Sequence, residues 1–137
     1  MKENAITDAL CGRISTANIL PAYMPNVKPS STVKAATNYL EVTFAASRTR
    51  RSGYDAASVV QKIAILQCVV VVPDGEGVIA VEDFADDIKT LFTASPILKL
   101  TITGGEIIIG TVDIKNGFNA DGEYRVPVLI PFTANQT

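Results

Sequence analysis

The stretch KIAILQCVVVVPDGEG, residues 62–77, poses the central structural question, because about ten mostly apolar residues end abruptly at Pro73-Asp74-Gly75. A helix that crosses a bilayer needs about twenty apolar residues, so this run is too short to span a membrane. Its side chains alternate between two faces, and both faces are apolar. We therefore expect a core strand that lies in the centre of its sheet or beneath a partner. One face carries Ile63, Ile65, Val69 and Val71, and the other carries Ala64, Leu66, Cys68, Val70 and Val72.

Two segments have the 3.6-residue period of amphipathic helices. The first covers residues 3–16, and the second covers residues 78–92. In the second helix the acidic residues lie early and Lys89 lies late, an order that the helix macrodipole favours. The apolar stripe of this helix consists of Val81, Phe84, Ala85, Ile88, Leu91 and Phe92.

An extended connector and another strand are expected between the first helix and the central strand. Prolines recur every four residues through residues 21–29, which excludes a helix and predicts an extended connector. Residues 39–46 alternate between apolar and polar side chains, which is typical of a half-buried strand. The polar residues 47–58 that follow predict a loop or arm.

The last part of the chain predicts a three-strand meander. A strand over residues 98–102 ends at a Gly-Gly dipeptide suited to a hairpin turn, and residues 106–115 return beside it. The final strand covers residues 124–132. Its Pro127 and Pro131 lack N–H donors on the same side, so we expect an edge strand whose prolines prevent further pairing.

Together these elements predict a single α+β domain over residues 1–137. We expect a mainly antiparallel or mixed sheet of about five strands, with two helices packed on one face. Only 19% of the residues are charged and 47% are hydrophobic, as in a subunit that buries part of its exterior in an assembly. The net charge of −2 provides no overall field that attracts nucleic acid or anionic membranes.

The residue types that common active sites need are largely missing from the sequence. The chain has no histidine, which excludes histidine-based triads and histidine metal sites. Cys11 and Cys68 predict two free thiols in a reducing cytoplasm, with a disulfide between them as the alternative, and two cysteines so far apart in the sequence do not suit a zinc site. No phosphate-binding or calcium-binding loop has its required residues. We therefore expect no enzyme activity, no cofactor and no bound metal.

Two clusters of charge remain as candidate interaction sites. Three arginines fall within residues 48–51 and suit phosphates or an acidic neighbouring surface, with a solvated loop as the alternative. The acidic side of the second helix suits a divalent cation or, as the plainer interpretation, a solvated helix face. The candidate residues are Arg48, Arg50, Arg51, Glu82, Asp83, Asp86 and Asp87.

The chain as a whole resembles the tail terminator (tail completion) proteins of long-tailed bacteriophages and prophages. The resemblance covers nearly the whole chain and rests on the order of elements and on short phrases, not on a catalytic signature. It is carried by AITDALCGRI, PAYMPNVKP, YLEVTF with the arginine-rich segment after it, VVVVPDGEG leading into AVEDFADDIKTLF, and GEYRVPVLIPF.

The resemblance implies a structural subunit of the virion tail or neck, assembled in the cytoplasm of the bacterial host. Such a subunit forms a homo-oligomeric ring, typically a hexamer, on the head-proximal end of the tail tube. The ring ends polymerisation of the tail tube protein and offers a surface to the head connector protein. DNA passes through its channel only as cargo, and neither a membrane nor a cofactor is involved.

Ring formation needs two different, complementary surfaces on each subunit, because the contacts around a ring are heterologous. The acidic side of the second helix and the segment from Arg48 to Arg51 are our candidates for these surfaces. The alternatives are another head–tail connector or head-closure protein, and a small ligand-binding or enzymatic α+β domain.

Overall fold

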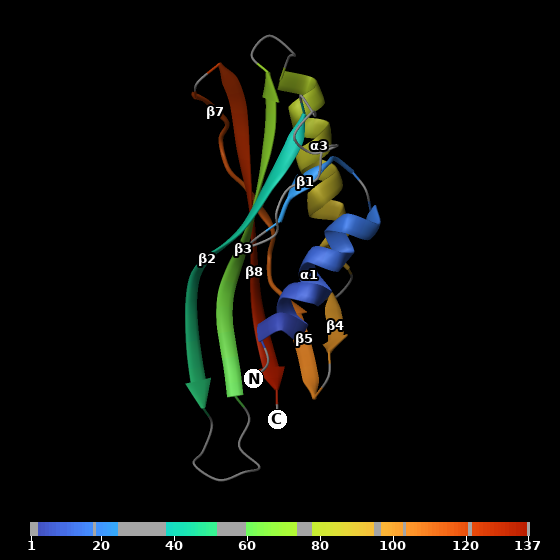
Figure 1. Ribbon diagram of the computed structural model, residues 1–137, viewed down its shortest axis with the longest axis vertical. Helices are drawn as coiled ribbons and strands as arrows, with labels where there is room; N and C mark the ends of the chain where they lie inside the picture. Colours follow the sequence, from blue (N-terminus) through green and yellow to red (C-terminus); the bar gives the residue numbers. More distant parts are fainter. Residues whose placement is uncertain are drawn as a thin grey trace.

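The computed structural model describes residues 3–17, 19–24, 38–51, 60–73, 78–94, 97–102, 104–120 and 122–136. Most of the proline-rich connector, the polar residues 52–59 and the turn at residues 74–77 lie outside these ranges, so their predicted conformations stay predictions. Figure 1 shows the elements, which are α1 (Glu3–Ala17), β1 (Ala22–Tyr23), β2 (Tyr39–Arg51), β3 (Val60–Pro73), α3 (Val78–Leu91), β4 (Lys99–Ile102), β5 (Gly105–Ile109), β6 (Asp113–Ile114), β7 (Phe118–Ala120) and β8 (Glu123–Gln136).

The strands form one twisted, mixed sheet in the order β1-β2-β3-β8-β5-β4, with β6 and β7 also paired to β8. All pairs are antiparallel except β1 with β2, which is parallel. The α+β class with two helices is confirmed. The prediction of about five strands was too low, because the described residues form eight.

The central position predicted for the apolar run is confirmed. β3 pairs with β2 on one side and with β8 on the other, and all 14 of its residues have a partner in β8. The side chains of Ala64, Leu66, Cys68, Val70 and Val72 are buried beneath the helices. Burial of these side chains joins β3, α1 and α3 in one hydrophobic core.

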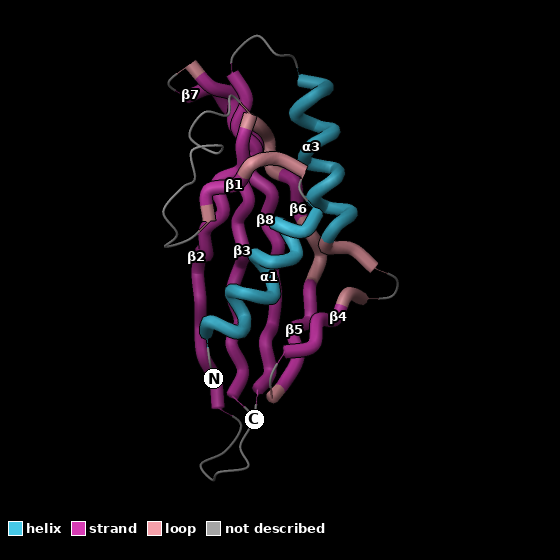
Figure 2. Tube along the Cα trace, turned by 45° about the vertical axis from the view of Figure 1, so that its right-hand side comes forward, coloured by secondary structure: helices cyan, strands magenta, loops and turns pink. Residues whose placement is uncertain are grey.

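Both helices cover the same face of the sheet, as predicted (Figure 2). α1 contributes Ile6, Leu10 and Ile14 to the core because these residues lie on one side of the helix. Arg13 Nε of α1 donates a hydrogen bond to the carbonyl oxygen of Leu91 at 2.8 Å. This bond satisfies a carbonyl at the C-terminal end of α3, where a positive charge is also favoured.

α3 has its basic residue where the sequence predicts it but its acidic residues slightly later. Lys89 lies in the last turn, whereas the first turn contains no acidic residue. Glu82 therefore begins the acidic series only in the second turn, where the macrodipole stabilises a carboxylate less.

The opposite face of the sheet, which we call the open face, carries no second layer among the described residues (Figure 2). Ile63 and Ile65 of β3 lie on it and are half-buried, while Val71 is fully buried. Both faces of β3 were expected to be covered. Within the described chain, one face is covered by the helices, and the other is covered only at the end of the strand near Val71.

The prediction that the final strand lies at a sheet edge is wrong, because β8 lies between β3 and β5. The carbonyl oxygens of Pro127 and Pro131 accept hydrogen bonds from Lys115 and Gly110 at 2.9 Å and 2.8 Å. The N and C=O of one strand residue point to the same side, so the missing N–H donors face residues 105–120. The prolines therefore interrupt the pairing on one side of β8 without ending the sheet.

The interruption explains why residues 105–114 form two short strands, β5 and β6, instead of the one return strand predicted over residues 106–115; a third short strand, β7, follows over residues 118–120. β5 ends before the position opposite Pro131, and β6 ends before the position opposite Pro127. The hairpin that precedes them is tight, because Ile102 pairs with Gly105 and Gly104 has a φ of 78°. A positive φ at Gly104 agrees with the predicted turn, whereas Gly105, which was expected in the same turn, is the first residue of β5.

Both cysteines are free thiols, as the sequence predicts. Cys68 is buried in the core, and burial raises its pKa to about 12. Burial and the nearby Asp8 carboxylate raise the pKa of Cys11. The thiolate is the reactive form of cysteine, and a catalytic nucleophile has a lowered pKa that favours it. The raised pKa values of Cys11 and Cys68 are the opposite of this.

Candidate interaction surfaces

The arginine-rich segment lies on a strand, which corrects the prediction of a loop after residue 46. β2 continues to Arg51 because residues 47–51 pair with residues 60–64 of β3. A bulge between Ala45 and Ser47 shifts the register and places Arg48 opposite Ile63. Charged residues and a bulge are devices that keep an edge strand from pairing with another chain.

Arg48 is exposed and, within the described chain, has no ion-pair partner. Arg50 and Arg51 follow it in the same strand, opposite Gln61 and Val60, and only their backbone is described. This end of β2 therefore presents at least one positive charge to solvent that no carboxylate among the described residues compensates.

The acidic side chains of α3 are exposed, as the helical period predicts. Among the described residues, none of the four carboxylates has an ion-pair partner. No group of three or more cysteine or acidic residues in the described ranges has the arrangement of a metal site. The four residues are Glu82, Asp83, Asp86 and Asp87.

The structure separates the acidic side of α3 into two pairs, which the sequence does not distinguish. Glu82 and Asp86 line a cavity of about 480 Å³ between α3 and the segment around β6 and β8. Asp83 and Asp87 do not line it. Both pairs have the i, i+4 spacing of neighbours on one side of a helix.

The two charge clusters are not brought together within one chain. In Figure 1 the arginine end of β2 lies at the bottom of the molecule, whereas α3 lies in the upper half. An attraction between the acidic helix and the arginine segment therefore requires two copies of the chain.

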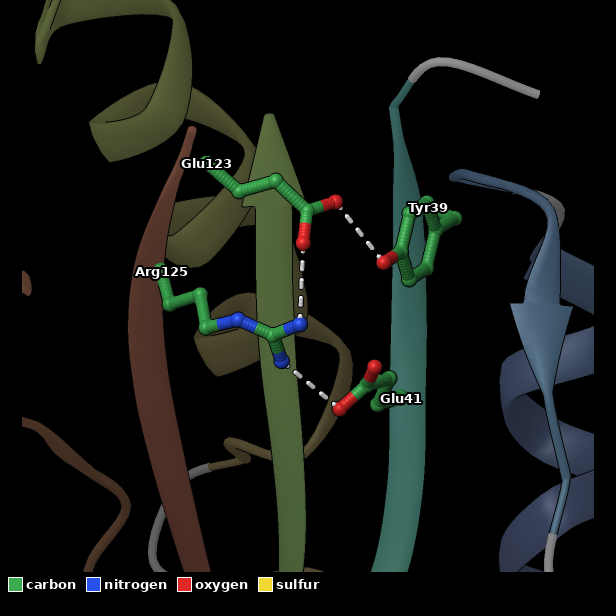
Figure 3. A network of polar contacts seen from close by, with 4 residues as sticks. All are labelled: Tyr39, Glu41, Glu123 and Arg125. Carbon is green, nitrogen blue, oxygen red and sulfur yellow. Dashed lines mark hydrogen bonds and ion pairs between the residues drawn. The ribbon is translucent and has the colours of Figure 1, made fainter. Parts of the chain in front are cut away.

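A polar network on the open face was not predicted from the sequence (Figure 3). Arg125 of β8 contacts Glu41 Oε2 of β2 at 2.9 Å and Glu123 Oε1 at 3.0 Å. Tyr39 of β2 donates a hydrogen bond from its hydroxyl to Glu123 Oε2 at 2.9 Å. The network crosses β3 above Val71, which pairs with Tyr39 on one side and with Arg125 on the other.

Two members of the network have raised pKa values. A hydrogen bond to Glu41 is the main cause of the raised pKa of Arg125, so its guanidinium stays charged. Burial, followed by the hydrogen bond to Glu123, raises the pKa of Tyr39 from 10.0 to about 12. The sequence does place Tyr39 and Glu41 on one side of their strand, but their partner on β8 depends on the sheet register.

The raised pKa of Tyr39 predicts a loss of stability at high pH. The folded state holds the phenolic proton more tightly than the unfolded state, so this stabilisation is complete below pH 10 and is lost as pH rises towards about 12. We expect the difference in unfolding free energy between the wild type and Tyr39→Phe to shrink over this range. Urea unfolding at a series of pH values measures it, and a difference that is constant with pH would refute the prediction.

Within the described residues, no helix is long and apolar enough to cross a membrane. The large apolar side chains that are exposed in this part of the chain are Ile97 and Phe118, which are 50% and 49% exposed. Phe118 lies on β7 and pairs with Arg125.

The fold and these surfaces define a small α+β protein whose distinctive features are a buried central strand, an open sheet face and separate clusters of opposite charge. A family model described as "Phage tail terminator protein" matches residues 5–132, and the chain belongs to this family. It is therefore a structural protein of phage tails. The family predicted from the resemblance is confirmed.

Two solved structures have the same fold over nearly the whole chain. One of them, whose name states no function, is 21% identical, with a TM-score of 0.73, and the match covers 98% of this chain and 96% of that chain. The other is described as "Virion of native gene transfer agent (GTA) particle"; it is 9% identical, with a TM-score of 0.60, and the match covers 98% and 97% of the two chains. No curated protein sequence matches the chain.

Proposed function

We propose that this protein forms a ring on the head-proximal end of the tail tube, ends polymerisation of the tube protein and provides the surface to which the head connector binds. The match of the family model to residues 5–132 carries this proposal. The similarity in fold to a chain from a virion particle supports a place in a multi-protein assembly. The ring is a hexamer, and DNA passes through its channel as cargo.

The charge distribution supports assembly through two different surfaces. Among the described residues of each subunit, the acidic side chains on α3 have no ion-pair partner, and the exposed Arg48 lies near the C-terminal end of β2. A contact between unlike surfaces is heterologous, and such contacts close into a ring when the rotation between subunits permits it. Complementary charges also steer subunits together and set their register.

The proposal assigns no catalytic step to the chain and no cofactor. Its partners are further copies of itself, the tail tube protein and the head connector protein. Assembly takes place in the bacterial host cytoplasm, and the product is part of the virion tail or neck.

The experiment that tests this proposal is capping of tail tubes. Purified protein is added to tubes assembled without a terminator, and their lengths and ends are measured by electron microscopy. We expect tubes of arrested length with a ring at one end. Tubes that continue to grow without added density would refute the role and favour a connector on the head side, which binding to head connector particles would then reveal.

A further inference from the structure

We infer that the cavity beside α3 is a binding site for an arginine side chain, and that Arg48 of a second copy of this chain supplies it. This inference rests on the proposed ring, to which it adds the residues of one subunit contact. Residues that line the cavity, which we call the α3 groove, include Glu82, Ala85, Asp86, Gly117, Tyr124 and Val126.

The α3 groove combines the three kinds of surface that a guanidinium group and its aliphatic stem require. Glu82 and Asp86, one helical turn apart, supply two carboxylates for charge-assisted hydrogen bonds. Ala85 and Val126 are buried core residues that form an apolar part of the lining. Tyr124 adds an aromatic ring, against which the planar guanidinium stacks better than a lysine ammonium does.

Gly117 is part of the construction of the groove. A Cβ atom at Gly117 would collide with the hydroxyl and ring of Tyr124 unless the ring moved. The glycine therefore lets the 115–117 segment approach Tyr124 closely. The cavity lies between α3 and this segment, so Glu82 and Asp86 line a concave site and not a flat helix surface.

The net charge of the groove favours a cation. The other charged residue in the lining is Lys115, and its Nζ lies 2.7 Å from Asp113 Oδ2. This ion pair offsets the positive charge of Lys115. Glu82 and Asp86 have no ion-pair partner among the described residues, so two negative charges remain uncompensated.

A second copy is the occupant that the structure favours. Arg48 is exposed and without an ion-pair partner in the described chain, so it has the complementary charge. It lies near the C-terminal end of β2, and this end of the strand is at the bottom of the molecule, whereas β7, which directly follows Gly117, lies at the top (Figure 1). One chain cannot fill its own groove with Arg48, so the contact joins the arginine end of one copy to the α3 end of the next.

The test compares two double variants of equal net charge. Glu82→Gln/Asp86→Asn removes the carboxylates of the groove, and Asp83→Asn/Asp87→Asn removes the same number of charges from the same helix outside the groove. A peptide of residues 47–51 is titrated into isotope-labelled protein, and amide shifts are followed by NMR. We expect shifts at Gly117 and Tyr124, about tenfold weaker binding by the first variant and less than about twofold by the second.

Equal weakening by the two variants, or shifts confined to residues outside the groove, would overturn the inference. The tube-capping assay then tests the source of the arginine: Arg48→Gln should reduce ring formation as strongly as Glu82→Gln/Asp86→Asn. Peptide binding without an effect of Arg48→Gln on rings would refute the second copy as the occupant. Peptide binding does not require tubes, so failure of wild-type capping would refute the proposed function separately from the arginine site.

Discussion

Replacing Ile130 with alanine is expected to lower the free energy of unfolding of this protein by about 2–5 kcal/mol. Ile130 is fully buried on the helix-covered face of β8 and pairs with Leu66 of the central strand, which is also fully buried. The substitution removes apolar contacts and leaves a cavity that the surrounding sheet and helices fill only in part. Urea unfolding followed by circular dichroism measures the loss.

Leu129→Ala is the matched control for Ile130→Ala. Leu129 is the adjacent residue of the same strand, and its half-buried side chain lies on the open face. Because less apolar surface leaves water there on folding, we expect a loss below about 1.5 kcal/mol in the unassembled protein. Similar losses for the two variants would contradict the assignment of a one-sided core.

Replacing Arg125 with methionine is expected to lower the free energy of unfolding by about 1–2 kcal/mol. The substitution keeps the aliphatic stem over the sheet but removes both ion pairs, so Glu41 and Glu123 face each other without a cation between them. The arginine side chain is only 22% exposed, which limits screening by solvent, although the 38% exposure of Glu41 reduces its share.

Lys115→Met is the control for the loss of an ion pair in solvent. The Lys115–Asp113 pair is more than half exposed on both sides, so we expect a change below about 0.5 kcal/mol. The interaction of Arg125 with Glu41 is measured with the single variants Arg125→Met and Glu41→Gln and with the double variant Glu41→Gln/Arg125→Met. The double variant relieves the repulsion between the carboxylates, so its loss of unfolding free energy should be smaller than the sum of the losses of the two single variants. Strict additivity would contradict the interaction between Arg125 and Glu41.

Much of the fold was accessible from the sequence because periodicity reports directly on burial. The 3.6-residue period placed both helices within one or two residues of their observed ends. The apolar run around Cys68 predicted a central strand because alternating residues that are all apolar avoid water on both faces. Local patterns of this kind need no knowledge of which strand is the neighbour.

The prediction for β8 shows where local patterns fail. Pro127 and Pro131 do lack donors on one side, but this fact alone is compatible with a sheet edge and with an interrupted neighbour. Residues 105–120 are the interrupted neighbour. Their short strands pair with β8 before, between and after the two prolines. Strand order arises from contacts between distant parts of the chain, which a pattern within one strand does not encode.

The candidate surfaces divide along the same line. Helical spacing alone placed Glu82, Asp83, Asp86 and Asp87 on the solvent side of α3. The arginines after residue 47 stood out because three of them fall within four positions of the sequence. Other features depend on the tertiary structure. The register of the sheet extends β2 through Arg51 and forms the network around Arg125. The packing of α3 over β8 makes one acidic pair differ from the other. A side chain's exposure follows from its own period, but its partners depend on which segments meet in three dimensions.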